Sequence, residues 1–345
     1  MNKSGSFKII KILQSNFYII FLSLTIALVI SLNGCAKCVS PTTISGFYFN
    51  TFIQITIYDE VSDDIKENIT KICEKYDTMF SPTKEGSELY LINTQKETTV
   101  SNEMVQIISD EIKYSKETEG IIDPTIQSIY ALWDFSGSSP IVPSDTVIKQ
   151  QLEYVDCNKI TINENTITKD NINIQLTLGY MAKGYIADQI AQYLINNNIN
   201  NAIINLGGNI LCLGNKNNNE KYTIGIEKPF ESGQSILTLN ISADKNPISI
   251  VTSGCYERCF EANGNLYHHL LDTTTGYPVN NGIYSVTIIG PHSTMCDKLS
   301  TALYLMGKEK GLNFIKSYPD YSAIFIDSDY NITYSDNFDL NKITE

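Results

Sequence analysis

The chain has 345 residues, and 42% of them are hydrophobic, which is enough for one large domain or two ordinary ones with a real core. Charged residues make up 18%, so the composition excludes an intrinsically disordered chain. The formal net charge of −13 argues against nucleic-acid binding, because an acidic surface repels phosphates. A dinucleotide ligand would therefore need a metal ion or local backbone donors to offset the repulsion.

Residues 1–34 have the pattern of an export signal. Three early lysines precede an apolar run at 17–32, which ends in Leu-Asn-Gly before Cys35. This junction resembles a bacterial lipobox, which predicts that Cys35 is acylated and becomes the first residue. The alternative is an uncleaved membrane helix with an incidental cysteine. Both readings place the following residues outside the cytoplasm, and the lipobox predicts a lipid anchor on the extracytoplasmic face of the cell membrane.

The remaining pattern predicts a linker at 35–45 and a single domain at 46–340. Strands are expected at 46–58, 222–227, 235–242, 248–252 and 283–290, with a strand at 202–213 broken by two glycines. Hairpins are expected within 159–178, at Asn263-Gly264 and near Ser328-Asp329. Helices are expected at 65–80, 102–118, 182–196, 293–306 and 308–317. Because hairpins are mixed with helices, the order predicts an α+β fold with mixed, mainly antiparallel sheets.

The segment 291–307 contains a possible metal site. Ser293 suits the N-cap of the expected helix, and Asp297, Ser300 and Thr301 lie three or four residues apart on nearly one face. A carboxylate with hydroxyl and backbone oxygens is a ligand set that suits Mg²⁺. Alternatively, Asp297 only complements the helix dipole.

Two glycine-containing segments could approach a phosphate. Lys183 lies between two glycines at the start of the helix expected at 182–196, where backbone N–H groups and one cation can meet phosphate oxygens. Gly207 and Gly208 allow a bulge or a close ligand approach within a strand. Each signal is weak alone, since glycines also serve packing.

Adjacent histidines follow the Asn263-Gly264 turn. Because consecutive strand residues face opposite sides, only one of His268 and His269 can point into a given cleft. A histidine near a metal and a carboxylate such as Asp272 could be a general base. The alternative is a half-exposed strand histidine with no chemical role.

The cysteines that follow Cys38 lack metal-finger spacing. Cys255 and Cys259 are close enough for a local disulfide, although buried thiols that act as small apolar residues explain the pattern as well.

Taken together, several segments resemble the ApbE family, the FAD:protein FMN transferases. The resemblance runs from about Phe49 to Asp327, and its segments occur in the family's order. They are MFSPTKEGSELYLIN (79–93), DPTIQSIYALWDF (123–135), LGYMAKGYIAD (178–188), INLGGNI (204–210), TSGCYERCF (252–260), YHHLLDTTTGYPV (267–279) and DKLSTAL (297–303). The resemblance implies an ApbE-like α+β fold and Mg²⁺-dependent transfer of FMN from FAD to a Thr or Ser hydroxyl through a phosphodiester bond, with release of AMP.

The resemblance also implies roles for individual residues. Asp297, Ser300 and Thr301 match the metal segment, and Tyr180 matches a residue whose carbonyl binds the same Mg²⁺. His269 matches a histidine thought to assist catalysis, with Asp272 as a second candidate base. The positions that match FAD contacts are Phe49, Met79, Ser87, Leu132, Trp133, Asp134, Thr177, Lys183 and Leu271, and Trp133 is expected to stack on a ring of the ligand.

The chain departs from the family pattern at four positions. The family often has Asp at position 177, Gly at 180, Asp at 255 and Pro at 273, where this chain has Thr177, Tyr180, Cys255 and Thr273.

The implied partners are FAD, an acceptor flavoprotein subunit of a membrane redox complex, and the membrane. A FAD pyrophosphatase that gives FMN and AMP is the nearest alternative, because water could replace the protein hydroxyl. A non-catalytic flavin-binding lipoprotein and an exported solute-binding protein are the other classes considered. The former could dispense with His269 and the metal residues, and nothing indicates the two similar lobes of the latter.

Overall fold

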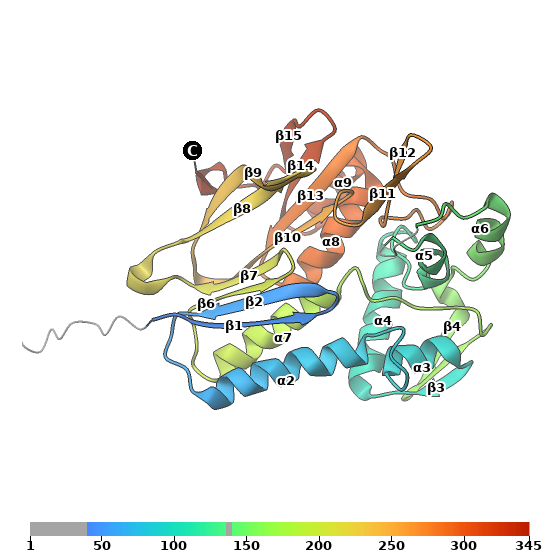
Figure 1. The fold of residues 1–345 in the computed structure, drawn as a ribbon, viewed down its shortest axis with the longest axis horizontal. Coiled ribbons are helices and arrows are strands. Elements are labelled where there is room, and N and C mark those ends of the chain that lie inside the picture. The colour runs from blue at the N-terminus through green and yellow to red at the C-terminus, as the bar shows by residue number, and fades with distance from the viewer. Residues whose placement is uncertain (1–39, 136–139, 345) are drawn as a thin grey trace, which may run out of the picture. The chain divides into compact units, whose positions relative to one another are not determined.

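The computed structural model describes residues 40–135 and 140–344, and its centre is one long sheet (Figure 1). The strand order is β1-β2-β6-β7-β10-β13-β14-β15, and each pair of neighbours is antiparallel. The bounds are β1 Thr42–Tyr48, β2 Thr51–Ile57, β6 Ala202–Leu206, β7 Asn209–Gly214, β10 Ala243–Gly254, β13 Ile283–Gly290, β14 Ser322–Asp327 and β15 Ile332–Tyr334. The predicted α+β class with mainly antiparallel sheets is confirmed.

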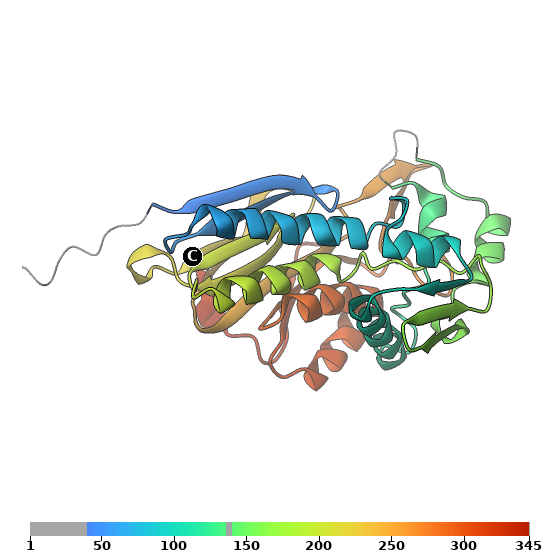
Figure 2. The same cartoon turned by 90° about the horizontal axis from the view of Figure 1, so that it is seen from below.

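Helices cover one face of this sheet, and a second sheet covers the other (Figures 1 and 2). The covering helices are α2 Asp63–Met79, α7 Ala182–Asn196, α8 Ser293–Met306 and α9 Lys308–Phe314. The second sheet has the order β16-β9-β8, with β8 Tyr222–Lys228, β9 Glu231–Ile241 and β16 Ile343–Thr344. Apolar strand residues alternate between the two faces, so a core lies on each side.

Shorter elements gather beyond one end of the long sheet (Figure 1). They are α3 Glu88–Thr94, β3 Glu97–Thr99, α4 Asn102–Glu117, α5 Gln127–Trp133, α6 Asp145–Leu152, β4 Ile160–Asn163, β5 Thr166–Lys169, β11 Cys259–Ala262 and β12 Asn265–His268. Strands β3, β5 and β4 form a small sheet, and β11 pairs with β12. No described helix is both long and apolar enough to span a membrane.

The N-terminal part of the sheet differs from the prediction. The single strand expected at 46–58 is a hairpin, because Phe49 and Asn50 both adopt positive φ angles, 56° and 57°, that turn the chain back. Since β1 begins at Thr42, the linker expected at 35–45 ends earlier, and pairing continues at the C-terminus to Thr344 rather than ending at 340. The predicted signal at 1–34 and Cys35 lie outside the described residues.

Two further strand predictions need correction. The run at 202–213 is two antiparallel strands, because Gly207 and Gly208 form their turn with φ of 64° and 90°. The hairpin expected within 159–178 closes at Lys169, and no strand follows it up to α7. In contrast, the predicted bounds of α7, β13 and α8 match the structure.

Strand register defines two ends of the long sheet. Thr42 is opposite Ile57, which is opposite Ala202, and β7 and β10 meet at Gly214 and Ala243 on the same side. We call this the Thr42 end. The β1–β2 turn, the β6–β7 turn and the last residue of β10, Gly254, lie at the other end, the Gly254 end.

Candidate active site

The candidate site begins where the first turn of α7 touches α8. The Gly184 N–H donates to Oδ2 of Asp297 at 2.9 Å. A Cβ atom on Gly184 would overlap the carbonyl of Ser293, so only glycine allows the helices to approach this closely. The contact holds Lys183 beside the buried Asp297 carboxylate.

A carboxylate of α7 fixes the start of α8. Asp188 accepts the backbone N–H groups of Ser293 at 2.8 Å and Thr294 at 2.9 Å, and it also accepts the Thr294 hydroxyl. Ser293 is thus the first helical residue rather than the predicted N-cap, and its hydroxyl instead donates to Oδ1 of Asn209 at 2.7 Å. A carboxylate from another helix replaces the local cap.

The three predicted metal residues of α8 lie together with a serine that the sequence did not single out. Ser300 donates its hydroxyl to the Asp297 carbonyl at 2.9 Å. Ser253 lies near the C-terminal end of β10. Its hydroxyl is 2.8 Å from the Ser300 hydroxyl and 3.1 Å from the Thr301 hydroxyl. Three hydroxyls therefore meet in a buried space beside the Asp297 backbone carbonyl, and we call Ser253, Asp297, Ser300 and Thr301 the oxygen cluster.

Burial sets the charge balance of this cluster. It raises the pKa of Asp297 to about 6, although Lys183 and the Gly184 N–H both favour the ionised form, and the charge of Glu257 raises the pKa further. A carboxylate held in this way, beside neutral oxygens, fits a hard divalent cation, which would restore its ionised form. No group of three His, Cys, Asp or Glu side chains suited to a metal occurs among the described residues, so hydroxyls and carbonyls would complete such a site.

Tyr180 lies just before α7, and its side chain packs with Ala302 of α8. Burial, together with the neighbouring Glu111 charge, raises the pKa of the Tyr180 phenol well above its usual value. Glu111 itself pairs with Lys298 at 2.9 Å in the core. The Tyr180 phenol therefore packs in the core rather than facing a ligand. The group of Tyr180 that could bind a metal ion is its backbone carbonyl.

The two histidines face different surroundings, as predicted. His268 is buried, with Nε2 3.2 Å from the Val279 carbonyl and 3.4 Å from the Tyr304 hydroxyl. His269 follows directly after β12, and its Nδ1 has no hydrogen-bond partner among the described side and main chains. Burial, followed by the charges of Arg258, His268 and Lys183, lowers the pKa of His269 to about 3. Its imidazole is therefore neutral at physiological pH, and these surroundings make it a weaker base than a solvated histidine.

Asp272 holds a turn through one of its oxygens. Its Oδ1 accepts the N–H and hydroxyl of Thr274, at 2.7 and 2.5 Å, and the N–H of Thr275 at 3.1 Å. These bonds fix the turn that leads to Gly276, and the role of Asp272 as a second candidate base stays a prediction.

The aromatic segment is also placed differently from the expectation. Trp133 has no exposed surface, lies against Phe135, Tyr267 and Tyr277 at ring distances of 5.3–5.7 Å, and donates its indole N–H to the Gly276 carbonyl at 3.0 Å. A ring closed in on all sides cannot stack on a ligand, so the stacking expected of Trp133 is wrong for this structure. Around it, Leu132 and Leu271 pack in the same cluster, and Asp134 is exposed with φ of 46°.

The other residues that match FAD contacts support nearby backbone. Phe49 donates its N–H to Oδ1 of Asp77 at 2.7 Å, which ties the β1–β2 turn to the end of α2 beside the buried Met79. Ser87 caps α3 by accepting the Tyr90 N–H at 3.1 Å. The Thr177 hydroxyl accepts the Gly179 N–H at 3.2 Å, and the Thr177 N–H donates to the Pro124 carbonyl at 2.8 Å.

Two charged residues complete the surroundings. Glu257 is exposed to solvent, yet the surrounding protein raises the pKa of its carboxyl, while Lys183 and Arg258 oppose this. Arg258 donates to the Tyr130 hydroxyl at 3.4 Å and so connects these two charged residues to the aromatic residues around Trp133. Both residues belong to the segment 252–260, whose pattern could have identified them.

The thiols around the site are free. Cys255 is buried and Cys259 half-buried, and neither forms a disulfide. Burial raises the pKa of the Cys255 thiol to about 11, so it acts as a small apolar residue.

A family model described as the ApbE family matches residues 49–325, which is most of the chain. The chain belongs to the ApbE family.

Relatives agree with this membership over most of their lengths. The chain is 31% identical to a FAD:protein FMN transferase of Klebsiella pneumoniae over 276 residues, covering 79% of this chain and 84% of the relative. It is 28% identical to one of Haemophilus influenzae over 337 residues, covering 93% and 97%. The ApbE protein of Thermotoga maritima aligns with a TM-score of 0.79 at 26% identity, and covers 88% of this chain and 99% of its own. The flavin transferase ApbE of Vibrio cholerae aligns with a TM-score of 0.76 at 26% identity, covering 87% and 98%.

Two hollows in this ApbE-family chain lie apart from the candidate site. One of about 660 Å³ is lined by the start of β10, the end of β13 and Lys342, and one of about 400 Å³ is lined by Gly120, Asp123 and Thr273 among others. Neither includes a residue of the oxygen cluster or His269. The candidate active site is therefore identified by its residues, the oxygen cluster with Lys183 and His269, and not by a cavity.

Proposed function

We propose that this chain is a FAD:protein FMN transferase, which moves FMN from FAD to a Thr or Ser hydroxyl of an acceptor flavoprotein and releases AMP. Membership of the ApbE family and the names of the relatives support this activity. The observation that carries it is the position of Lys183, whose charge acts on Asp297, Glu257 and His269 together. One cation thus acts on the carboxylate of the oxygen cluster and on the His269 imidazole.

The oxygen cluster fits a magnesium requirement. Asp297 with the hydroxyls of Ser300 and Thr301, and the Tyr180 carbonyl, would hold Mg²⁺. When bound there, Mg²⁺ would neutralise charge on the pyrophosphate of FAD. Lys183 would contribute a further positive charge, which an acidic protein needs in order to bind a dinucleotide.

In the proposed reaction, His269 is the base that accepts the proton of the acceptor hydroxyl. The acceptor hydroxyl oxygen forms a bond to the FMN-side phosphorus, the bond from this phosphorus to the bridging oxygen breaks, and AMP leaves with that oxygen. The hydroxyl proton passes to the imidazole of His269, whose buried Nδ1 has no hydrogen-bond partner among the described residues. Burial, with the charges of Arg258 and Lys183, lowers the pKa of this imidazole, and the negative pyrophosphate would offset the two charges and make the imidazole more basic.

We also propose the location and partner that the N-terminal sequence indicates. Cys35 anchors the chain to the extracytoplasmic face of the cell membrane through a lipid, and the acceptor is a flavin-carrying subunit of a membrane redox complex. The Leu-Asn-Gly-Cys junction after the apolar run supports the anchor.

The activity is tested by incubating the protein with FAD and Mg²⁺, with and without a candidate acceptor flavoprotein. Covalent flavin on the acceptor together with AMP is the expected result. Free FMN and AMP at the same rate without acceptor would instead make the chain a FAD pyrophosphatase. Bound FAD with neither product would make it a flavin-binding protein. The His269→Ala variant should lose about 10²–10⁴-fold in transfer rate while FAD affinity changes little.

A further inference from the structure

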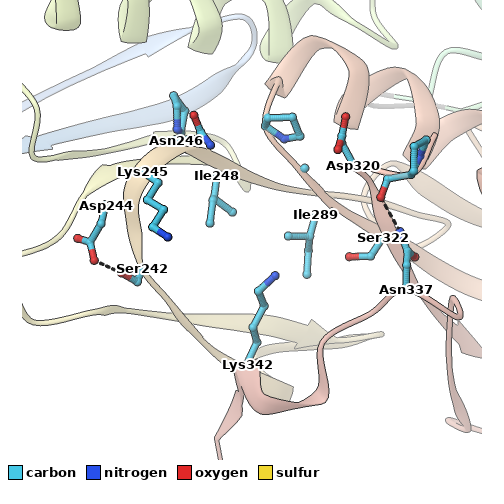
Figure 3. A pocket seen from close by; sticks show the side chains of 14 residues that line it. Ser242, Asp244, Lys245, Asn246, Ile248, Ile289, Asp320, Ser322, Asn337 and Lys342 are labelled. Atoms are coloured by element: carbon cyan, nitrogen blue, oxygen red, sulfur yellow. Dashed lines mark hydrogen bonds between the residues drawn. The ribbon is translucent and has the colours of Figure 1, made fainter.

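Outside the oxygen cluster, opposite charges meet in an open hollow and in the packed core. In the larger hollow, lysines and aspartates line the same accessible space, so their charges balance (Figure 3). In the core between α4 and α8, Glu111 and Lys298 pair at 2.9 Å, and their side chains are only 1% and 7% exposed. Lys298 directly follows Asp297, so this buried ion pair begins one residue from the candidate metal site.

The buried ion pair is incomplete. Removing two charges from water costs about as much free energy as their pairing recovers, so such a pair needs a reason other than stability. Nζ of Lys298 contacts Oε1 of Glu111 and lies 4.3 Å from the centre of the Tyr114 ring. Oε2 of Glu111, however, is buried with no hydrogen-bond partner among the described residues. A further donor at this oxygen would remove an energetic cost.

The Tyr180 phenol lies next to this carboxylate. Its ring packs with Ala302, which is one turn after Lys298 on the same face of α8. Its hydroxyl is also buried without a partner among the described residues. After burial, the Glu111 charge is the largest influence that raises the pKa of this phenol, so the two groups are neighbours. Two unpartnered polar groups therefore share one part of the core.

The main chain of Tyr180 is free to bind a ligand. In a regular helix, the Gly184 N–H would donate to the carbonyl four residues earlier, which is that of Tyr180. Here this N–H donates to Oδ2 of Asp297 at 2.9 Å, and no hydrogen bond to the Tyr180 carbonyl occurs among the described residues. Tyr180 thus has an unbonded carbonyl where α7 meets Asp297 and an unbonded hydroxyl beside Glu111.

From these two free groups on one residue, we propose that Glu111 and Lys298 are positioning residues for the metal site. The Tyr180 hydroxyl donates to Oε2 of Glu111, Lys298 holds the carboxylate in place, and the bond fixes the Tyr180 carbonyl toward the ion. The inference rests on the magnesium site of the proposed function. It also accounts for the departure from the family pattern at position 180, because a glycine there has no side chain that could form this bond.

A partner that orients a metal ligand affects the affinity for the ion more than the stability of the fold. Loss of such a partner typically lowers metal affinity by about 10–100-fold. Tyr180→Phe removes the hydroxyl and keeps the ring and the carbonyl, so the apparent dissociation constant for Mg²⁺ should rise by about tenfold. Because the hydroxyl has no partner in the structure, the urea midpoint without Mg²⁺ should not fall.

The test measures Mg²⁺ binding without turnover, in the full-length protein. The rise of the urea midpoint with Mg²⁺ concentration gives the apparent dissociation constant in the absence of FAD. Tyr114→Phe is the matched control, because it also removes a buried, unpartnered tyrosine hydroxyl, three residues after Glu111, and keeps the ring beside Lys298. This control should bind Mg²⁺ as tightly as the wild type.

A second variant removes the ion pair without leaving one charge buried. Glu111→Met/Lys298→Met should fold, since apolar residues of similar length replace both charges, and should weaken Mg²⁺ binding by the same factor as Tyr180→Phe. Adding Tyr180→Phe to it should cause no further loss, because the three residues act through one hydrogen bond. Glu111→Gln/Lys298→Met keeps an acceptor for the phenol and should bind Mg²⁺ nearly as the wild type does.

Unchanged Mg²⁺ affinity in Tyr180→Phe would overturn the proposal, as would losses that add in the combined variant. An equal loss in Tyr114→Phe would also overturn it, since packing and not the bond would then be responsible. If Mg²⁺ did not stabilise the wild type, both the metal site and the positioning role would be overturned. Weaker Mg²⁺ binding by Tyr180→Phe, in a protein that transfers no FMN to the candidate acceptor, would support the positioning role and contradict the proposed function.

Discussion

The burial of the Asp297 carboxylate leads to a prediction about a variant in which metal binding and folding stability change in opposite directions. Asp297 is 4% exposed, and burial raises its pKa from 3.8 to about 6. The folded protein therefore holds the Asp297 proton more tightly than the unfolded chain does. This carboxyl favours folding most at a pH below 3.8, and its contribution is lost as the pH rises from there through 6.

The size of the effect follows from the two pKa values. At pH 7.5 the ionised Asp297 costs about 3 kcal/mol of folding free energy relative to a neutral group, and at pH 5 the cost is about 1.6 kcal/mol. Asparagine has nearly the same shape and keeps an oxygen for the Gly184 N–H. We therefore expect Asp297→Asn to raise the free energy of unfolding at pH 7.5 by up to about 3 kcal/mol without a divalent ion, and by about half as much at pH 5.

Urea unfolding in a chelator at the two pH values measures this difference. Mg²⁺ should then stabilise the wild-type protein and leave Asp297→Asn unchanged, and the variant should transfer no FMN. Asp170→Asn, at an exposed carboxylate, is the matched control and should change stability by less than about 0.5 kcal/mol. If Asp297→Asn were less stable than the wild type at both pH values in chelator, the raised pKa of Asp297 would be refuted. The ionised carboxylate would then stabilise the metal-free protein instead of costing folding free energy.

Three other perturbations test the fold, the histidines and the anchor. His268→Ala should lower the free energy of unfolding by about 2–3 kcal/mol, because it removes a buried ring that contacts Tyr304, and an unchanged urea midpoint would contradict this. Gly184→Ala should cost about 1–3 kcal/mol and reduce transfer, since its Cβ meets the Ser293 carbonyl, and unchanged melting and activity would contradict the close contact of α7 and α8. Cys35→Ser should release the protein from the membrane fraction or leave it as a precursor, whereas normal acylation would exclude the lipobox.

Long elements with strong periodicity were predictable, and short ones were not. The ends of α7 and α8 follow from apolar spacing that continues over several turns. Helices of seven or eight residues, such as α3 and α6, contain too few turns for a period to appear. The turn at Phe49 has positive φ at an aromatic residue, a conformation that residue preferences do not anticipate, so a hairpin resembled one strand.

The candidate site was predictable only where its residues are neighbours in sequence. Spacing on one helix grouped Asp297 with Ser300 and Thr301. Ser253 meets Ser300 and Thr301, and Asp188 fixes the start of α8, through contacts between distant elements, which no local pattern contains. The turn held by Asp272 was in principle readable, because Asp followed by threonines and a glycine favours such a turn over a free carboxylate.

The burial of Trp133 has a spectroscopic consequence. It is the only tryptophan in the chain, so all indole fluorescence reports on this one environment. Its neighbours come from α5, the loop at Gly276 and the strand that precedes His269, and they are held by the indole N–H bond. Opening of the β11–β12 hairpin would expose the indole to water and shift its emission to the red, and a flavin bound at the proposed site beside Lys183 would quench it by energy transfer. Tryptophan fluorescence can thus measure both FAD binding and opening of the β11–β12 hairpin without an added label.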